Sequence, residues 1–159
     1  GHYDVVLTAF NYSLLWREAL IAILPEAKKQ NMGIIVGSPL QQGALSRRHP
    51  EIKTGAWWLS PQRQNQFKQL YAFLDDIQLS LPEVSLRMVL SNPDISTVLM
   101  GARSVDEVEQ NVESVNAGPL PTDILESLRE IADMVPFRPF EEPFGLPFGR
   151  SYAGPWHAR

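Results

Sequence analysis

Short apolar runs alternate along the chain with segments whose apolar residues recur every three or four positions. Three runs rich in β-branched residues, 4–10, 33–37 and 95–100, are typical of strands that are buried on both faces. The segments between and after them have the spacing of amphipathic helices: 14–31, 61–77, 82–91, 105–115 and a last one with its apolar residues between 124 and 132. Strands that alternate with helices in this order predict βα units and a parallel three-stranded sheet.

Local signals mark several helix starts. Ser60 followed by Pro61 is a cap and a proline in the first turn, and Pro25 is expected to open a second short helix within 14–31. Ser104 and Glu107 have the spacing of a capping box. The helix that follows Ser104 presents one apolar face: Val105, Val108, Val112 and Val115.

The two ends of the chain suggest an incomplete unit. A sheet of three parallel strands leaves two edges with unpaired backbone groups, which native proteins avoid, and the chain opens at Asp4 directly into a strand. We therefore expect a fragment of a longer protein, or a chain that is covered by a second copy of itself. Residues 135–159 repeat Pro-Phe four times, which excludes a helix or central strand, and their aromatics argue against disorder. The predicted organisation is a domain over 1–134 with the tail 135–159 packed on it.

Composition narrows the functional classes. The 159 residues are 44% hydrophobic and 20% charged, which suits one soluble domain with a real core. A net charge of −4 without a long basic run leaves no electrostatic footprint for nucleic acid, and no apolar run is long enough for a membrane span. The absence of cysteine excludes disulfides and thiolate chemistry. With no signal-like start, a cytoplasmic location is expected. His2, His49 and His157 lack metal-ligand spacing and are expected at the surface.

Two turns that follow neighbouring strands carry the candidate chemistry. Ser38 opens a 22-residue loop, and loops of that length in compact domains are usually functional or disordered, although an ordinary turn also explains its first residues. Arg103 precedes the helix at 105, whose free N–H groups and dipole favour an anion; the alternative is a capped helix with a solvated arginine. Loops after strands seven and eight of (β/α)8 barrels often form a phosphate site, which two such turns would fit.

Three ordered motifs stand out: Asp4-Val-Val-Leu-Thr-Ala-Phe-Asn11-Tyr12-Ser13-Leu-Leu, Ile34-Ile-Val-Gly-Ser38-Pro39-Leu40-Gln-Gln-Gly43-Ala-Leu45, and Ile95-Ser-Thr-Val-Leu-Met-Gly101-Ala-Arg103 with Glu109-Gln110-Asn111. In sequence and spacing they resemble the carboxyl-terminal part of the aldo-keto reductase family, in particular the branch with sugar dehydrogenases such as L-galactose dehydrogenase. The resemblance implies an α/β fold, a partial (β/α)8 TIM barrel made of roughly the last three βα units with a carboxyl-terminal helix and tail.

The resemblance also implies an NADP- or NAD-dependent oxidoreductase that reduces small carbonyls or oxidises sugar hydroxyls. Carried over residue by residue, it gives three groups of cofactor-binding positions: Ser38, Pro39, Leu40 and Gly43 at the pyrophosphate, Gly101 and Arg103 near the adenosine 2′-phosphate, and Glu107, Gln110 and Asn111 at the adenine and its ribose.

The chain departs from the family pattern at the reacting end of the site. The catalytic aspartate, tyrosine, lysine and histidine of the family lie on earlier strands, so no catalytic residue is predicted here and the chain alone is expected to be inactive. Gly37 stands where an aromatic often stacks on the nicotinamide, and Leu7 where a glutamine is common. Glu107 stands where arginine or glutamine is common; its carboxylate would repel a 2′-phosphate, which leaves NADP and NAD both open. As the capping partner of Ser104, Glu107 also has a purely structural explanation.

Two functional hypotheses follow. The first is the cofactor-binding part of an aldo-keto reductase, whose partner is the amino-terminal half of the barrel. The second is a non-catalytic partial barrel that self-associates and retains a nucleotide pocket, since channel-associated β-subunits of the same family have binding or regulatory roles. Neither involves nucleic acid, a membrane or a metal.

Overall fold

The computed structural model describes residues 2–55 and 59–137 of the chain. Its strands, α-helices and short 3₁₀ helices (η) follow this order: β1 (Val5–Ala9), η1 (Glu18–Leu20), α1 (Ile23–Lys29), β2 (Gly33–Gly37), η2 (Gln41–Gly43), α2 (Glu51–Thr54), α3 (Pro61–Ile77), α4 (Leu81–Leu90), β3 (Thr97–Leu99), α5 (Val105–Asn116) and α6 (Thr122–Asp133). None of the helices in these residues is long and apolar enough to cross a membrane.

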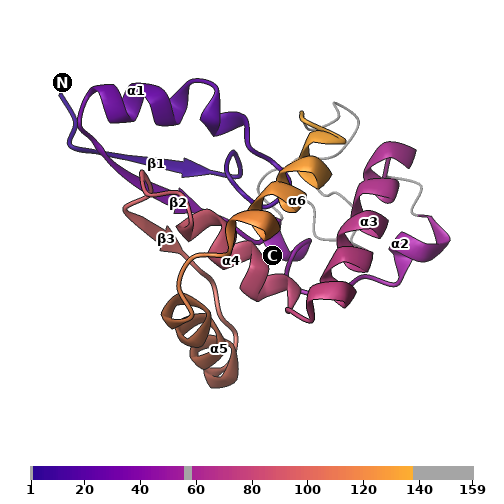
Figure 1. The fold of residues 1–159 in the computed structure, drawn as a ribbon. Coiled ribbons are helices and arrows are strands. Elements are labelled where there is room, and N and C mark those ends of the chain that lie inside the picture. Colours follow the sequence, from indigo (N-terminus) through magenta and orange to yellow (C-terminus); the bar gives the residue numbers. More distant parts are fainter. Residues whose placement is uncertain (1, 56–58, 138–159) are drawn as a thin grey trace, which may run out of the picture.

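The three strands form one parallel sheet in the order β1-β2-β3 (Figure 1). Val36 of β2 pairs with Thr8 on one side and with Val98 on the other, and Gly37 pairs with Leu99. The predicted α/β fold with a parallel sheet is therefore confirmed, and it is consistent with a portion of a (β/α)8 barrel. Because β2 and β3 are parallel neighbours, the segments that follow them leave the same edge of the sheet.

The two faces of the sheet differ sharply. Ile34 and Val36 are fully buried on the face that the helices cover, and Thr8 lies beside them. The opposite face has no covering layer among the described residues, so the expectation of strands buried on both faces is wrong for β1 and β3. In a closed barrel the corresponding face of each strand points into the interior, where apolar side chains are expected. Its exposed side chains are Val5, Leu7 and Leu99, at 51%, 54% and 51% exposure.

The helices after the loop begin where the sequence predicts. The Ser60 hydroxyl accepts a hydrogen bond from the Arg63 N–H at the start of α3, and Ser80 caps α4 in the same way. The buried face of α3 packs against α6, whose Leu128 is also buried. The spacing of the apolar residues predicted both helices because each packs one face against other residues of this chain.

A buried polar network that no sequence pattern predicts joins α3 to α6. The Gln66 side-chain amide donates to the backbone carbonyls of Ile131 (2.8 Å) and Ala132 (3.0 Å) near the end of α6. Arg63 donates to the Gln66 carbonyl oxygen, and its guanidinium lies 5.2 Å from the ring centre of Trp16. Both polar side chains are almost completely buried. The network therefore acts as a specific clamp between the two helices.

The segment 14–31 departs from its prediction. Only η1 and α1 are helical, and α1 begins at Ile23, so Pro25 is its third residue and not its first. A local turn explains the difference, because the Ser13 hydroxyl accepts from the Trp16 N–H (3.2 Å) while the Ser13 N–H donates to the Trp16 carbonyl (2.7 Å). Such side-chain bonds to the backbone compete with a helix.

The third strand and the tail also need comment. β3 covers Thr97–Leu99 and is shorter than the predicted 95–100, since Asn92 and Ile95 belong to the preceding turn. Val135 is buried at the end of α6, and Phe137 is exposed. The remainder of the predicted tail, 138–159, lies outside the described residues, as do His157 and the Pro-Phe repeats after Phe137.

Candidate functional site

The segment that follows β2, residues 38–43, adopts an unusual backbone conformation. Ser38, Gln41 and Gln42 have φ angles of 57°, 49° and 53°, in the left-handed region that residues with a Cβ rarely occupy. Gly43 has a φ of 102°, where only glycine is unstrained. Each left-handed non-glycine residue costs on the order of 1 kcal/mol. The surrounding structure must therefore hold this segment in place.

Buried side chains hold the segment at two points. The Gln41 side chain is 2% exposed, and its amide nitrogen donates to the Ser13 hydroxyl oxygen at 2.5 Å. At the far end, the His49 Nε2 atom lies 3.1 Å from the Gly43 carbonyl oxygen, to which its N–H tautomer donates. The Tyr71 hydroxyl accepts from the His49 backbone N–H (3.1 Å).

The position of His49 corrects a prediction. We expected it at the surface, but it is only 5% exposed. Burial lowers the pKa of His49 below its ordinary value, and the hydrogen bond to the Gly43 carbonyl opposes this shift. The neutral ring is therefore the form that fits the folded loop. His2 is exposed, as expected.

The backbone of the segment offers a hydrogen-bond donor. Among the described residues, the Leu40 N–H has no acceptor, whereas the Leu40 carbonyl accepts from the N–H groups of Gly43 and Leu45. Free N–H groups in successive turns form concavities that attract anions. The segment can therefore donate to a phosphate oxygen at the carboxyl end of β2.

The turn between β3 and α5 confirms one predicted contact and changes another. The Ser104 hydroxyl accepts from the Glu107 N–H at 3.2 Å, so the cap is present. In a full capping box the Glu107 carboxylate would accept from Ser104 itself. Here it accepts instead from the Arg103 backbone N–H (2.7 Å) and from the Arg103 guanidinium (2.8 Å). The N–H groups of Val105 and Asp106 have no acceptor within the described part of the chain.

This ion pair changes the electrostatics of the turn. Arg103 is 85% exposed, and its hydrogen bond to Glu107 raises the pKa of the guanidinium. The same hydrogen bond lowers the pKa of the Glu107 carboxyl. Arg103 therefore stands at the mouth of the turn as predicted, but as half of an ion pair and not as a free cation.

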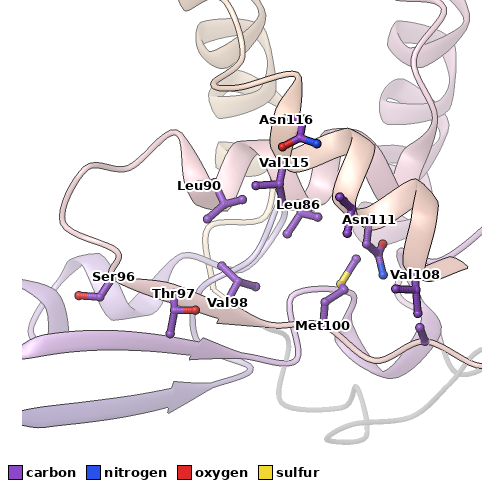
Figure 2. Close-up of a pocket in the computed structure, with 12 residues that line it drawn as sticks. Leu86, Leu90, Ser96, Thr97, Val98, Met100, Val108, Asn111, Val115 and Asn116 are labelled. Atoms are coloured by element: carbon purple, nitrogen blue, oxygen red, sulfur yellow. The ribbon is translucent and has the colours of Figure 1, made fainter.

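A cavity of about 480 Å³ lies between β3, α4 and α5 (Figure 2). Its walls are mostly apolar, with Val98 and Met100 on one side, Leu86 on another, and the predicted apolar face of α5 on a third. Val108, Val112 and Val115 of α5 line this open cavity and remain half-exposed, whereas Val105 lies outside it and is more exposed. Of the nine predicted cofactor-binding residues, Asn111 lines this cavity and the other eight do not.

The predicted residues thus fall into two groups at one edge of the sheet. Ser38, Pro39, Leu40 and Gly43 follow β2; Gly101, Arg103, Glu107, Gln110 and Asn111 follow β3. A Cβ on Gly101 would meet no atom of the described residues within 4 Å, so their packing does not require glycine there. Gln41, Ser13 and His49 were not predicted to hold this segment, because the sequence does not show which side chains meet across the loops. The repeated glutamine in Ser-Pro-Leu-Gln-Gln-Gly was the one available hint.

Comparison with known proteins supplies a family. The model of the aldo/keto reductase family matches residues 1–133. L-galactose dehydrogenase of Arabidopsis thaliana is 32% identical over 115 residues, which cover 72% of this chain and 35% of that protein. The uncharacterized oxidoreductase YrpG of Bacillus subtilis is 28% identical (80% and 40% covered) and the NADH-specific methylglyoxal reductase of Escherichia coli is 27% identical (84% and 43% covered). The chain spans about two-fifths of the length of these relatives.

Proposed function

The chain belongs to the aldo/keto reductase family, and we propose from this premise that it holds the pyrophosphate and adenosine of an NAD(P) cofactor in an oxidoreductase barrel. One observation carries the proposal. Gly37 pairs with Leu99, so the two segments that resemble the cofactor-binding segments of the family leave adjacent strands at the same edge of the sheet. Ligands of parallel α/β sheets bind at the carboxyl ends of strands.

In this proposal the segment after β2 binds the pyrophosphate. The binding residues are Ser38, Pro39, Leu40 and Gly43. The Leu40 N–H, which has no acceptor among the described residues, supports this role because phosphate oxygens accept hydrogen bonds. The left-handed angles at Ser38 and Gly43 give the backbone a sharp curvature there, which favours close approach of a ligand.

The turn after β3 would bind the adenosine. Gly101 supplies open space, and the free first-turn N–H groups of α5 favour negative charge. Gln110 and Asn111 would contact the adenine and its ribose. The Glu107 carboxylate already accepts from the Arg103 guanidinium, so it would compete with a 2′-phosphate for this cation. We therefore propose that the Arg103–Glu107 pair sets the balance between NADP and NAD.

The binding experiment compares NADPH and NADH on the purified chain by calorimetry. Arg103→Ala should weaken NADPH more than NADH, because only NADPH carries the 2′-phosphate. Glu107→Gln should strengthen NADPH relative to NADH, because it removes a competing and repulsive carboxylate. Glu109→Gln, at an exposed position of the same helix, is the control for net charge. Equal losses for both cofactors would remove the 2′-phosphate role, and no binding of either would refute the proposed function.

Catalysis is proposed to need residues beyond this chain. Hydride transfer to a small carbonyl, or from a sugar hydroxyl, requires a positioned acid or base at the reacting oxygen. The family places that group on strands that precede the matched part. The purified 159-residue chain should therefore not reduce a generic aldehyde with NADPH or NADH. Measurable reduction of the aldehyde by the purified chain, with this activity lost in the Arg103→Ala variant, would contradict the expectation that the chain alone is inactive.

A second candidate function follows from the uncovered face of the sheet. Val5, Leu7 and Leu99 are exposed, and β1 and β3 are sheet edges within the described residues. Such a surface favours completion by further strands, either from the other half of a barrel or from a second copy of this chain. Sedimentation of the purified chain distinguishes the two: a dimer or larger assembly that Leu7→Lys dissociates supports the self-associating module. A monomer at all concentrations excludes self-association.

A further inference from the structure

We propose that Gln41 is a positioning residue, which anchors the pyrophosphate-binding segment after β2 to the loop after β1 and so holds the segment in its binding geometry. This inference rests on the proposed function, because it assumes that the segment contacts the cofactor. It goes beyond that proposal by assigning a role to Gln41 and Ser13, two residues outside the predicted cofactor-binding set.

The contact has the features of a built anchor. Gln41 is 2% exposed and Ser13 is fully buried, and the Gln41 amide nitrogen donates to the Ser13 hydroxyl oxygen at 2.5 Å. The two residues are 28 positions apart, so the bond ties the loop after β1 to the loop after β2. A buried hydrogen bond of this kind resists exchange with water.

The acceptor is itself fixed. The Ser13 hydroxyl also accepts from the Trp16 N–H (3.2 Å) and donates to the Trp16 carbonyl (3.4 Å). A hydroxyl has one proton and two acceptor positions, and with Gln41 all three are in use. Ser13 therefore presents one defined lone pair to Gln41, which makes the contact directional.

Gln41 is costly for folding, which argues for a purpose other than stability. Its backbone is left-handed, with a φ of 49°, and its side-chain carbonyl oxygen is buried without a hydrogen-bond partner among the described residues. An unpaired buried acceptor and a strained backbone together destabilise a fold, and such outliers gather at functional sites. The cost is compatible with selection for the geometry of the segment.

The anchor acts where the segment needs it. Gln41 follows Leu40, whose N–H has no acceptor in the described part of the chain, and precedes Gln42, another left-handed residue. His49 holds the Gly43 carbonyl at the far end of the segment, so Gln41 and His49 fix it at two points. A segment held in this way has already lost the conformational freedom that cofactor binding would otherwise remove.

The experiment compares Gln41→Met with Gln42→Met. Methionine has nearly the volume of glutamine but cannot donate to Ser13, and the exposed, equally left-handed Gln42 is the matched control. In the free protein, hydrogen–deuterium exchange of the peptide 38–46 should accelerate in Gln41→Met and stay as in the parent in Gln42→Met. Gln41→Met should also weaken NADH and NADPH by the same factor, about tenfold, because the pyrophosphate is common to both.

Ser13→Ala and the double variant complete the test. If the anchor is one unit, Ser13→Ala should reproduce the loss of affinity, and the double variant should lose no more than either single variant. Unchanged exchange in Gln41→Met would overturn the anchor. Altered exchange with unchanged affinity would overturn its role in binding. If the parent chain binds neither cofactor, the proposed function fails and the binding role of Gln41 falls with it, whereas the exchange data still decide whether the anchor exists.

Discussion

Replacing Gln66 by leucine tests the polar clamp between α3 and α6. The substitution keeps the approximate size of the side chain but removes two hydrogen bonds to the carbonyls of Ile131 and Ala132, at 2.8 and 3.0 Å. It also removes an acceptor of the buried Arg63 guanidinium. Two neutral hydrogen bonds contribute about 1 kcal/mol each, and a bond to a charged group contributes about 1.5–3 kcal/mol. We expect Gln66→Leu to lower the free energy of unfolding by about 3.5–5 kcal/mol.

Urea denaturation followed by circular dichroism measures this change directly. The midpoint should fall while the slope stays constant, because the surface that unfolding exposes is nearly the same. Gln69→Leu, at an exposed position of the same helix, should change the free energy of unfolding by less than about 0.5 kcal/mol. If Gln66→Leu unfolds at the same urea concentration as the parent, or if both variants lose equally, the clamp does not contribute in the way that its geometry indicates.

Two further predictions concern the loops at the candidate site. Gly101→Ala should leave stability unchanged, since a Cβ there meets no atom of the described residues within 4 Å, but it should weaken cofactor binding. Gly43→Ala should lower the free energy of unfolding by about 1 kcal/mol or more in thermal unfolding, since the φ of Gly43 is 102°. An equal effect of both variants on stability would contradict this reasoning. Burial lowers the pKa of His49, so below its ordinary pKa of about 6.5 the unfolded chain binds a proton that the folded chain does not. Neutral His49 should therefore make its full contribution to the free energy of unfolding above that pH, and this contribution should decline as the pH falls toward the lowered pKa. Urea midpoints for His49→Gln should show a smaller decline with pH. An equal decline in the parent and the variant would exclude His49 as the cause.

The sequence predicted most closely the elements that nearby residues mark or that other described residues cover. The start of α3 was readable because Ser60 and Pro61 mark it, and the strand 33–37 agrees with β2 in both bounds because β2 is the central strand of the sheet. For β1 and β3 the apolar run was read correctly as a strand, but hydrophobicity alone does not say which layer covers it. Leu7 and Leu99 are exposed because none of the described residues covers them, which their own sequence does not reveal.

The candidate site divides in the same way. Its two segments follow from motifs with fixed spacing, and the register of β2 with β3 supports their proximity. The anchor between Gln41 and Ser13 could not be read from the sequence, because it links residues 28 positions apart and no periodicity marks either one. The sequence predicted only one of the two contacts at the start of α5. The Ser104 cap was expected, but not that the Glu107 carboxylate accepts from the Arg103 N–H in place of the Ser104 N–H.

The exposed apolar face of the sheet is also expected to affect how the chain behaves in a cell. Exposed apolar side chains beside strand edges that have no neighbour within the described residues, as Val5, Leu7 and Leu99 lie here, promote strand-to-strand aggregation. If further strands complete the sheet, as proposed above, the abundance of this chain should follow their supply. Without them the chain should precipitate or be degraded.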